Sequence, residues 1–347
     1  MKAVAGGRLH AAALATMLAL SPVVAAQVAV TGGPALDYQA SVVQPWGEPG
    51  VRIVVFERLT GASLLGDLWV TRSEDSGATW SLPSLAVGTA ANERHAALVQ
   101  TAEELFQLFY LKDEGGPSYR IHRASSTNGV SFIEQGRVEL GWASAGEINP
   151  HVIRQSDGTL LMTYHRLGGA SYIAASVDGG LTWDEDRVQI SQGNAALPRL
   201  AYRESDRLYL AVYQTNPGNN QLQLWARTSD DAGAWIDPPV QITSDGNNHD
   251  ALPFVLEDDR FALLWARVAD GHFQIFSMGS GNGLDWAYRR QLTRRQNLAN
   301  VQPHALAIGG GVADVYWGAA QDGGGSDYDI VRQTVDFDEL FGDGFEP

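Results

Sequence analysis

Residues 176–183 read SVDGGLTW, and this octapeptide decides how the rest of the chain is interpreted. A close copy, SEDSGATW, lies at 73–80. Weaker copies are SSTNGVSF at 125–132, TSDDAGAW at 228–235 and GSGNGLDW at 279–286. The five copies begin 52, 51, 52 and 51 residues apart. A regular period of this size indicates a repeat architecture, in which each repeat is one supersecondary unit.

Each interval between copies contains the same succession of short apolar segments. In the third unit these are 151–155, 159–166 and 171–176, followed by 182–190 after the octapeptide. Their length and their content of β-branched and aromatic residues predict four β-strands per unit. Glycine is abundant, with 38 residues, and long amphipathic helical patterns are missing from the sequence. The chain is therefore predicted to be all-β.

Six units can be counted, and the last is incomplete. It begins at His304, and its octapeptide stops after Asp336, so its fourth strand is missing. We expect residues 27–32 to supply that strand, because an unpaired edge would otherwise remain in a closed ring. Six four-stranded antiparallel units of this size predict a six-bladed β-propeller, closed by the N-terminal strand in the last blade.

The ends of the chain are predicted to lie outside the propeller of residues 27–336. Residues 1–26 are typical of a secretory signal peptide, since the basic residues Lys2 and Arg8 precede an apolar stretch, 11–25, that ends in small residues. We therefore expect export, to the periplasm or the medium. Residues 337–347 form an acidic tail, which we interpret as a disordered end rather than a sorting signal.

Composition excludes several classes of protein. The chain has 40 acidic and 24 basic residues and a net charge of −16, which argues against nucleic acid and anionic membranes as partners. The absence of cysteine excludes disulfides, thiol catalysis and zinc–thiolate sites. We expect a monomer without cofactor or metal, and a glycan or an extracellular protein as its partner.

The octapeptide itself is predicted to be structural. An Asp in a tight turn accepts hydrogen bonds from backbone N–H groups, Gly adopts positive φ, and the Trp can be buried between sheets. It resembles the Asp-box, or BNR, repeat of the sialidase-type propellers, which implies the propeller fold and no catalytic role for the box. The structural residues expected from it are Ser73, Asp75, Gly77, Trp80, Ser176, Asp178, Gly180, Trp183, Asp230, Trp235, Gly283 and Trp286.

Candidate ligand-binding residues are expected at the opposite end of the strands. Aligning the starts of the first strands places His95, His151, Arg199 and His304 at one position around the channel. The ends of the second strands carry buried-type aromatics, followed by the basic residues Arg58, Lys112, Arg166 and Arg267. A basic and aromatic mouth would attract a carboxylate-bearing or polyhydroxylated ligand. The aromatics could instead belong to the core, the histidines could cap the channel, and the arginines could be solvated strand ends.

The sialidase resemblance implies an exo-glycosidase with three arginines on the substrate carboxylate, a Tyr nucleophile activated by a Glu, and an Asp acid/base. By position, the nucleophile would be Tyr316, the activating acid Glu147 or Glu93, and the acid/base Asp250 or Asp37. Arg199, Arg166 and Arg267 would form the triad. The family's Arg-Ile-Pro element is missing, since 51–56 reads VRIVVF. Two hypotheses follow: a secreted propeller that binds a glycan or another extracellular ligand at the channel mouth, or a sialidase-type hydrolase of acidic glycans.

Overall fold

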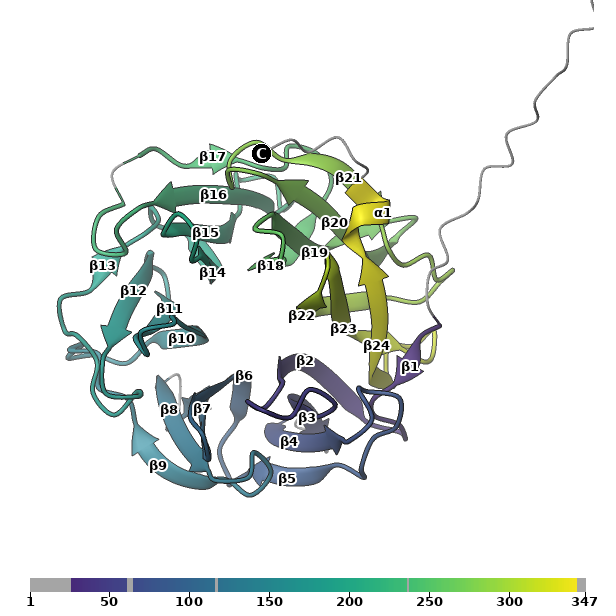
Figure 1. Cartoon of the computed structure of the whole chain (residues 1–347), viewed down its shortest axis with the longest axis horizontal. Coiled ribbons are helices and arrows are strands. Elements are labelled where there is room, and N and C mark those ends of the chain that lie inside the picture. Colours follow the sequence, from purple (N-terminus) through teal and green to yellow (C-terminus); the bar gives the residue numbers. More distant parts are fainter. Residues whose placement is uncertain (1–25, 61–64, 116–117, 236, 342–347) are drawn as a thin grey trace, which may run out of the picture.

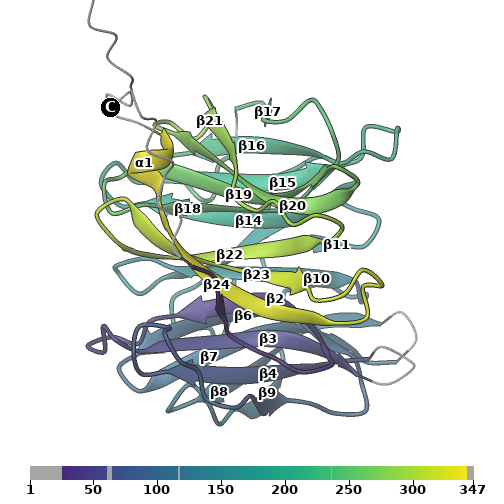
Figure 2. The same ribbon diagram turned by 90° about the vertical axis from the view of Figure 1, so that its right-hand side faces the viewer.

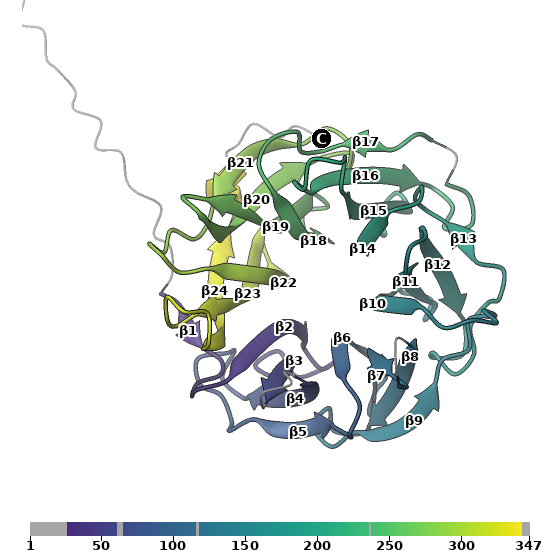
Figure 3. The ribbon, with the colours of Figure 1, turned by 180° about the vertical axis from the view of Figure 1, so that it is seen from behind.

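The computed structural model of the chain describes residues 26–60, 65–115, 118–235 and 237–341. Within these ranges the chain forms strands β1 to β24 and one short helix, α1 (Phe337–Phe341). The strands are arranged around a central axis, as Figures 1 and 3 show from opposite sides. Seen from the side in Figure 2, they run between the two faces of the ring. No helix in the described ranges is long and apolar enough to span a membrane.

Each of the first five repeats contributes four strands at successively greater distance from the axis. The sixth contributes three, and the N-terminal strand β1 is its outermost strand. The innermost strands are β2 (Leu36–Val43), β6 (Glu93–Ala102), β10 (Glu147–Arg154), β14 (Ala195–Arg203), β18 (Asn248–Val255) and β22 (Asn300–Gly309). The second strands are β3 (Arg52–Thr60), β7 (Leu105–Asp113), β11 (Leu160–Arg166), β15 (Leu208–Thr215), β19 (Phe261–Ala269) and β23 (Val312–Ala320).

The third and fourth strands are progressively more exposed. The third strands are β4 (Leu65–Ser73), β8 (Tyr119–Ser126), β12 (Ser171–Ser176), β16 (Gln223–Ser229), β20 (His272–Ser280) and β24 (Tyr328–Asp336). The outermost are β5 (Ser84–Val87), β9 (Ile133–Arg137), β13 (Val188–Gln189), β17 (Val240–Gln241), β21 (Ala287–Gln291) and β1 (Val28–Ala29).

The core of the molecule lies between neighbouring repeats. Six hydrophobic clusters each join two consecutive repeats, and one of them joins the last repeat to the first. In one cluster, Ile53 and Leu68 of the first repeat pack with Leu108 of the second, and all three are fully buried. Each sheet is therefore covered on both faces, which explains why the second strands are continuously apolar rather than alternating.

The sheets differ from the prediction in one respect. Repeats two to five form separate four-stranded sheets, whereas the first and last repeats share one eight-stranded sheet. They are joined by a parallel pairing of Leu36 in β2 with Tyr328 in β24. The predicted pairing of the N-terminal segment is present, since Val28 lies opposite Arg332 and the Val30 N–H donates to the Ile330 carbonyl at 2.8 Å.

The predicted boxes are hairpins between the third and outermost strands. In the first, the Asp75 carboxylate accepts hydrogen bonds from the Ser73 hydroxyl and the Thr79 N–H, both at 2.8 Å. The Trp80 indole donates to the Gly77 carbonyl at 3.2 Å, and Gly77 has a φ of 83°. The hairpin is thus held by its own residues, and Asp178 in the third repeat is bound in the same way.

Three boxes are one residue shorter than the sequence alignment assumed. Their serines are Ser126, Ser229 and Ser280, each one residue after the predicted start. In the fourth box the carboxylate that binds the turn is consequently Asp231, which accepts the Gly233 N–H at 2.8 Å. The prediction of Asp230 was wrong, because the alignment allowed no deletion between the acidic residue and the Trp.

At the position predicted for the sixth box, the chain instead begins helix α1. The Asp336 carboxylate accepts the N–H groups of Asp338 and Glu339 at 2.9 and 3.2 Å, as an N-cap does. Phe337 and Phe341 are buried against the last repeats. The interpretation of residues 337–341 as a disordered end was therefore wrong, and residues 342–347 lie outside the described residues.

Candidate functional site

All six innermost strands carry a β-bulge at the same position near the axis. In each, the inner strand has one more residue than the second strand at this point, so that the register shifts by one residue. The first bulged residue has a positive φ although it is not glycine, a conformation that is uncommon and that clusters at functional sites. These residues are Gln39 (47°), His95 (55°), Asn149 (56°), Leu197 (49°), Asp250 (54°) and Gln302 (53°).

The bulge corrects the predicted alignment of the histidines. His151, Arg199 and His304 do share one position, because they follow the bulge and lie opposite Thr163, Val212 and Tyr316. His95 is itself a bulge residue, two positions earlier in its repeat. The residue of this repeat that matches His151 is Ala97. No proline precedes Ala97, whereas one directly precedes His151, Arg199 and His304, so the alignment lacked that marker and placed His95 in the wrong layer.

Arg199 lies at the centre of these residues. Its Nη1 donates to the carbonyl oxygens of Pro198 and Asn149 at 3.2 and 3.4 Å. With its amide turned to satisfy both ends, Gln39 accepts from Arg199 Nη2 at 3.2 Å and donates to Glu57 Oε1 at 2.6 Å. Burial lowers the pKa of Arg199 to about 10, so the guanidinium remains charged at neutral pH.

The carboxyl group of Asp250 shares this environment. Burial raises its pKa to about 6, Arg199 opposes that rise, and Glu57 adds to it. Burial also lowers the pKa values of His95 and His304 to about 4, with the charge of Arg199 acting in the same direction. At neutral pH the two histidines are therefore neutral donors and acceptors beside one guanidinium.

The bulges surround a narrow space on the axis. Gln39, His151, Arg199, Asp250, Gln302 and His304 are among the residues that line it. Its volume of about 30 Å³ accommodates one or two water molecules. The predicted residues His151, Arg199, His304 and Asp250 are therefore brought together.

The predicted basic residues at the mouth are engaged by carboxylates. Two residues before the bulge, three inner strands carry a buried acid, and a cation on the second strand lies directly opposite. The pairs are Arg58 Nε to Asp37 Oδ1 at 2.7 Å, Lys112 Nζ to Glu93 Oε1 at 3.5 Å, and Arg166 Nη1 to Glu147 Oε1 at 3.2 Å. Arg120 also donates to Glu147, at 2.7 Å.

Arg267 is also paired with an acid, but this acid does not lie on the strand position opposite it. It lies opposite Asn248, whose oxygen accepts the Trp265 indole N–H at 2.9 Å, and it pairs with Asp245 at 2.8 Å. Each of the four predicted cations is therefore already paired with an acid of the described chain, and together they do not form a free ring for a ligand carboxylate. The expectation of an arginine triad fails for Arg166 and Arg267, because each already holds an acidic side chain.

Tyr316 lies in the core between the last and first repeats. It is fully buried, with Phe56 and Ile330 in the same cluster and the Trp80 ring edge-on at 6.2 Å. Burial raises its pKa. A substrate cannot reach this hydroxyl in the structure, so Tyr316 is not a suitable nucleophile, and Glu147 is bound by two arginines rather than by a tyrosine. The core interpretation of the second-strand aromatics is the correct one here.

Glu57 is the site residue that sequence reasoning missed. It is fully buried, and it accepts the Arg94 Nε–H at 2.8 Å and the His95 backbone N–H at 2.7 Å. Burial alone would raise its pKa, but His95 and Arg94 outweigh this effect and lower it. A signal was present, since an acid inside the apolar run IVVFERL is unusual in a strand covered on both faces.

Comparison of the chain with known protein families and solved structures assigns a family to this arrangement of box hairpins around an axis. An all-β ring with Asp-box hairpins on one face has the fold of the BNR-type propellers. The family description of a BNR repeat-like domain matches residues 62–260, more than half of the chain, and the chain belongs to that family. The resemblance that the boxes indicated is thereby confirmed. No curated protein matches the sequence.

Solved structures share the fold at low sequence identity. A protein of unknown function from Dyadobacter fermentans is 14% identical with a TM-score of 0.72, over 89% of this chain and 97% of that one. The α-L-arabinofuranosidase Arb93A of Fusarium graminearum is 12% identical with a TM-score of 0.69, over 92% and 99%. The K499G mutant of the NanB sialidase of Streptococcus pneumoniae is 12% identical with a TM-score of 0.66, over 90% of this chain and 71% of that one. Identities this low establish the fold alone.

Proposed function

We propose that the protein is an exported six-bladed propeller that binds a glycan at the bulge end of its axis. In this proposal the eight-stranded sheet counts as two blades, and β1 completes the last one. Residues 1–26 act as the signal peptide, and the mature chain works as a monomer. The similarity to arabinofuranosidase and sialidase folds supports a carbohydrate ligand.

The strained bulges are the observation that carries the proposal. Five of the six bulge residues have polar side chains, namely Gln39, His95, Asn149, Asp250 and Gln302. A non-glycine residue with positive φ costs on the order of 1 kcal/mol, and six of them at one level of the axis need a reason beyond folding. The space between these side chains holds only one or two water molecules, so the sugar would lie over its opening and offer hydroxyl groups to the amide and carboxyl groups there.

The charge distribution favours a neutral sugar over an acidic one. Arg58, Lys112, Arg166 and Arg267 each hold a carboxylate of the protein. A sugar carboxylate would have to compete with buried acids such as Asp37 and Glu147. A neutral, polyhydroxylated glycan meets no such competition.

Asp250 favours hydrolysis as a second candidate function. Its pKa of about 6 keeps a sizeable protonated fraction near neutral pH, as a general acid needs. Glu57, with a lowered pKa, lies within electrostatic range, and pairs of carboxyl groups with diverging pKa values are typical of glycosidases. Glu57 is fully buried, however, so it could reach a substrate only through a movement.

Binding is tested with a glycan microarray and calorimetry on neutral oligosaccharides, arabinobiose and sialyllactose. We expect a neutral glycan to bind, and Gln302→Ala to weaken it roughly tenfold because a hydrogen bond to the sugar is lost. Gln241→Ala, on the exposed outer strand β17, is the matched control. Equal affinity of both variants, or no bound glycan at millimolar concentration, would reject the proposal.

Hydrolysis is tested with 4-nitrophenyl α-L-arabinofuranoside and a fluorogenic sialoside. Turnover that disappears in Asp250→Asn and persists in Tyr316→Phe would establish the second function. No turnover on either substrate, together with glycan binding, leaves the protein as a binding module.

A further inference from the structure

Arg199 differs from the other arginines at the bulge end of the strands in its partners. Arg58, Arg94 and Arg120 each contact a carboxylate, at 2.7 or 2.8 Å. Within the described residues, Arg199 donates only to uncharged oxygens, which are two backbone carbonyls and one amide, at 3.2 to 3.4 Å. A buried charge without a counter-ion is costly, so this guanidinium favours an anion on the axis.

The side chains around this charge can offer further N–H donors. The contacts of Arg199 account for at most three of its five N–H groups. Burial and the charge of Arg199 hold the pKa of His151 well below its usual value, so its ring is neutral. Nδ1 of this ring accepts the Leu200 N–H at 3.2 Å, which places the proton on Nε2. Nδ1 of His304 is enclosed, without a partner among the described residues, so only its Nε2 can meet a ligand.

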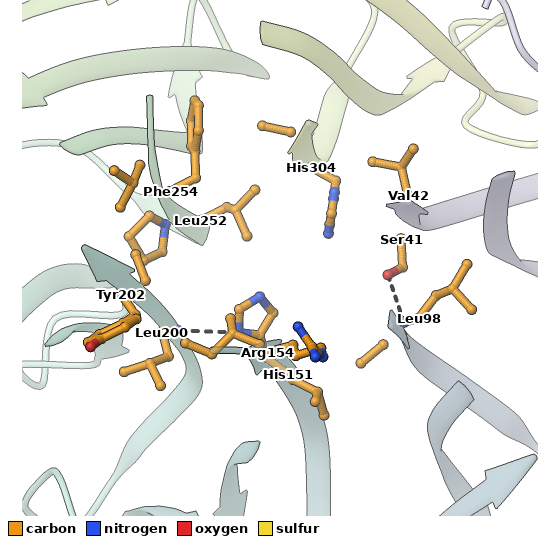
Figure 4. A pocket seen from close by; sticks show the side chains of 17 residues that line it. Ser41, Val42, Leu98, His151, Arg154, Leu200, Tyr202, Leu252, Phe254 and His304 are labelled. Carbon is orange, nitrogen blue, oxygen red and sulfur yellow. Dashed lines mark hydrogen bonds between the residues drawn. The ribbon is translucent and has the colours of Figure 1, made fainter. Parts of the chain in front are cut away.

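The space between these donors limits the size of a ligand. Arg199, His151 and His304 line the narrow space of about 30 Å³, which has room for one or two water molecules. The two histidines also line a larger cavity of about 320 Å³ on the axis, so the two spaces adjoin. Figure 4 shows both imidazole rings directed toward the open centre. A monatomic anion such as chloride, only slightly larger than a water molecule, fits between the donors, whereas a sugar does not.

Asp250 decides at which pH such an ion can be held. Its carboxyl group lines the same space and, when ionised, would repel an anion. Burial raises its pKa to about 6, against the charge of Arg199 and together with that of Glu57. Burial would also raise the pKa of Glu57, but His95 and Arg94 lower it, so Glu57 stays ionised. Below pH 6 the neutral Asp250 removes the repulsion and can donate its O–H to the anion.

The imidazole groups near Asp250 stay neutral above pH 5.5. Burial lowers the pKa of three of them to about 4, namely His95, His165 and His304. The ring of His151 is neutral as well. His249, the neighbour of Asp250 on β18, packs against the Phe273 ring of β20, away from the axis. Asp250 is therefore the group of this set whose charge changes between pH 5.5 and 7.5.

We propose that the axis holds a chloride ion, or another halide of similar size, between Arg199, His151 and His304, and that the ion binds together with a proton on Asp250. The ion neutralises the guanidinium and connects four innermost strands, β10, β14, β18 and β22, at one level. Proton and anion each raise the affinity for the other, as linkage requires. The inference does not depend on the proposed glycan, which would lie over the opening of this space.

A chloride titration followed by chlorine NMR line width tests both parts on the wild-type protein. Sodium gluconate, whose anion is too large for the space, keeps the ionic strength constant. We expect saturable broadening with an affinity at least roughly tenfold higher at pH 5.5 than at pH 7.5, because the protonated fraction of Asp250 falls by at least this factor. No saturable broadening at pH 5.5 would overturn the site, and equal affinity at both pH values would overturn its coupling to Asp250.

Variants assign the two roles. Arg199→Gln is expected to abolish saturable chloride binding, because the charge is lost. Arg290→Gln, on the exposed strand β21, is the matched control and should bind chloride as the wild type does. Asp250→Asn keeps a neutral donor of the same size, so its affinity should be the same at pH 5.5 and 7.5. Equal loss in both arginine variants, or a pH dependence that persists in Asp250→Asn, contradicts the assignment.

A crystal of the wild-type protein covers the case in which Arg199→Gln does not fold. Grown with sodium bromide at pH 5.5, it should show an anomalous bromine peak between the Arg199 guanidinium and Nε2 of His151. Peaks at surface residues only would refute the axial site, whatever the glycan measurements show.

Discussion

Carboxylates at the two ends of the repeats have different partners. At the box end, Asp178 accepts N–H and hydroxyl groups of its own exposed hairpin. At the bulge end, Glu147 is buried against two arginines, whereas Asp250 lies beside the axis and makes neither kind of contact at short range. The contacts of Asp178 and Glu147 stabilise the fold. The position of Asp250 has no such structural role, which points to a functional one.

The largest expected effect comes from Glu147. Glu147→Gln leaves Arg120 and Arg166 without their acid, and removing one partner of a buried ion pair costs about 3 kcal/mol or more. Chemical denaturation should show this loss in the free energy of unfolding. The control is Glu139→Gln, whose pair with Arg137 is largely exposed and should be nearly neutral. Similar effects for both would show that burial does not set the difference.

The second effect has the opposite sign. The pKa of Asp250 is raised from 3.8 to about 6 in the folded protein. The folded state therefore loses stability as the pH rises from about 4 to above 6, because the buried carboxyl group must then ionise. Asp250→Asn should therefore stabilise the protein by about 2 kcal/mol at pH 7 and by little at pH 4. Thermal unfolding at both pH values measures the difference. A variant that is destabilised at pH 7 would mean that Asp250 is structural.

The smallest effect is expected in the box. Hydrogen bonds from Thr182 and Ser176 outweigh burial and lower the pKa of Asp178 from 3.8 to about 2. Its ionised form therefore adds stability above pH 3.8, and this stability is lost as the pH falls toward 2. Asp178→Asn should cost less than about 1 kcal/mol at pH 7. Two boxes already use Asn in this position, Asn128 and Asn282, with the same backbone contacts. A pH-independent cost would contradict the charge-based explanation.

The repeat period made the fold accessible from the sequence. Boxes can be found by their glycine and tryptophan alone, because those residues serve a local turn whose geometry the sequence determines. The errors there amounted to one residue, as with Asp230 in place of Asp231. The joining of the first and last repeats into one sheet depends on a single parallel contact, Leu36 with Tyr328, that leaves no mark in either segment.

The site was harder to predict, because it depends on register. Proximity of His151, Arg199 and His304 followed from their repeat position, and Asp250 was found with them. His95 was aligned with this layer by residue type, because its repeat lacks the proline that precedes the other three residues. Cross-strand partners also decided whether a charge was free: the acids Asp37, Glu93 and Glu147 could have been matched to Arg58, Lys112 and Arg166 by comparing repeats, and that comparison would have removed the arginine triad from consideration.

The sixfold recurrence of the bulge makes the axial positions interchangeable. Each presents one side chain from the same backbone conformation, so exchanging Leu197 for a polar residue, or Gln302 for another, need not move its five counterparts. Ligand preference can therefore diversify one position at a time while the boxes and the cores between repeats stay constant. A library randomised at these six codons alone would sample new specificities on an unchanged scaffold.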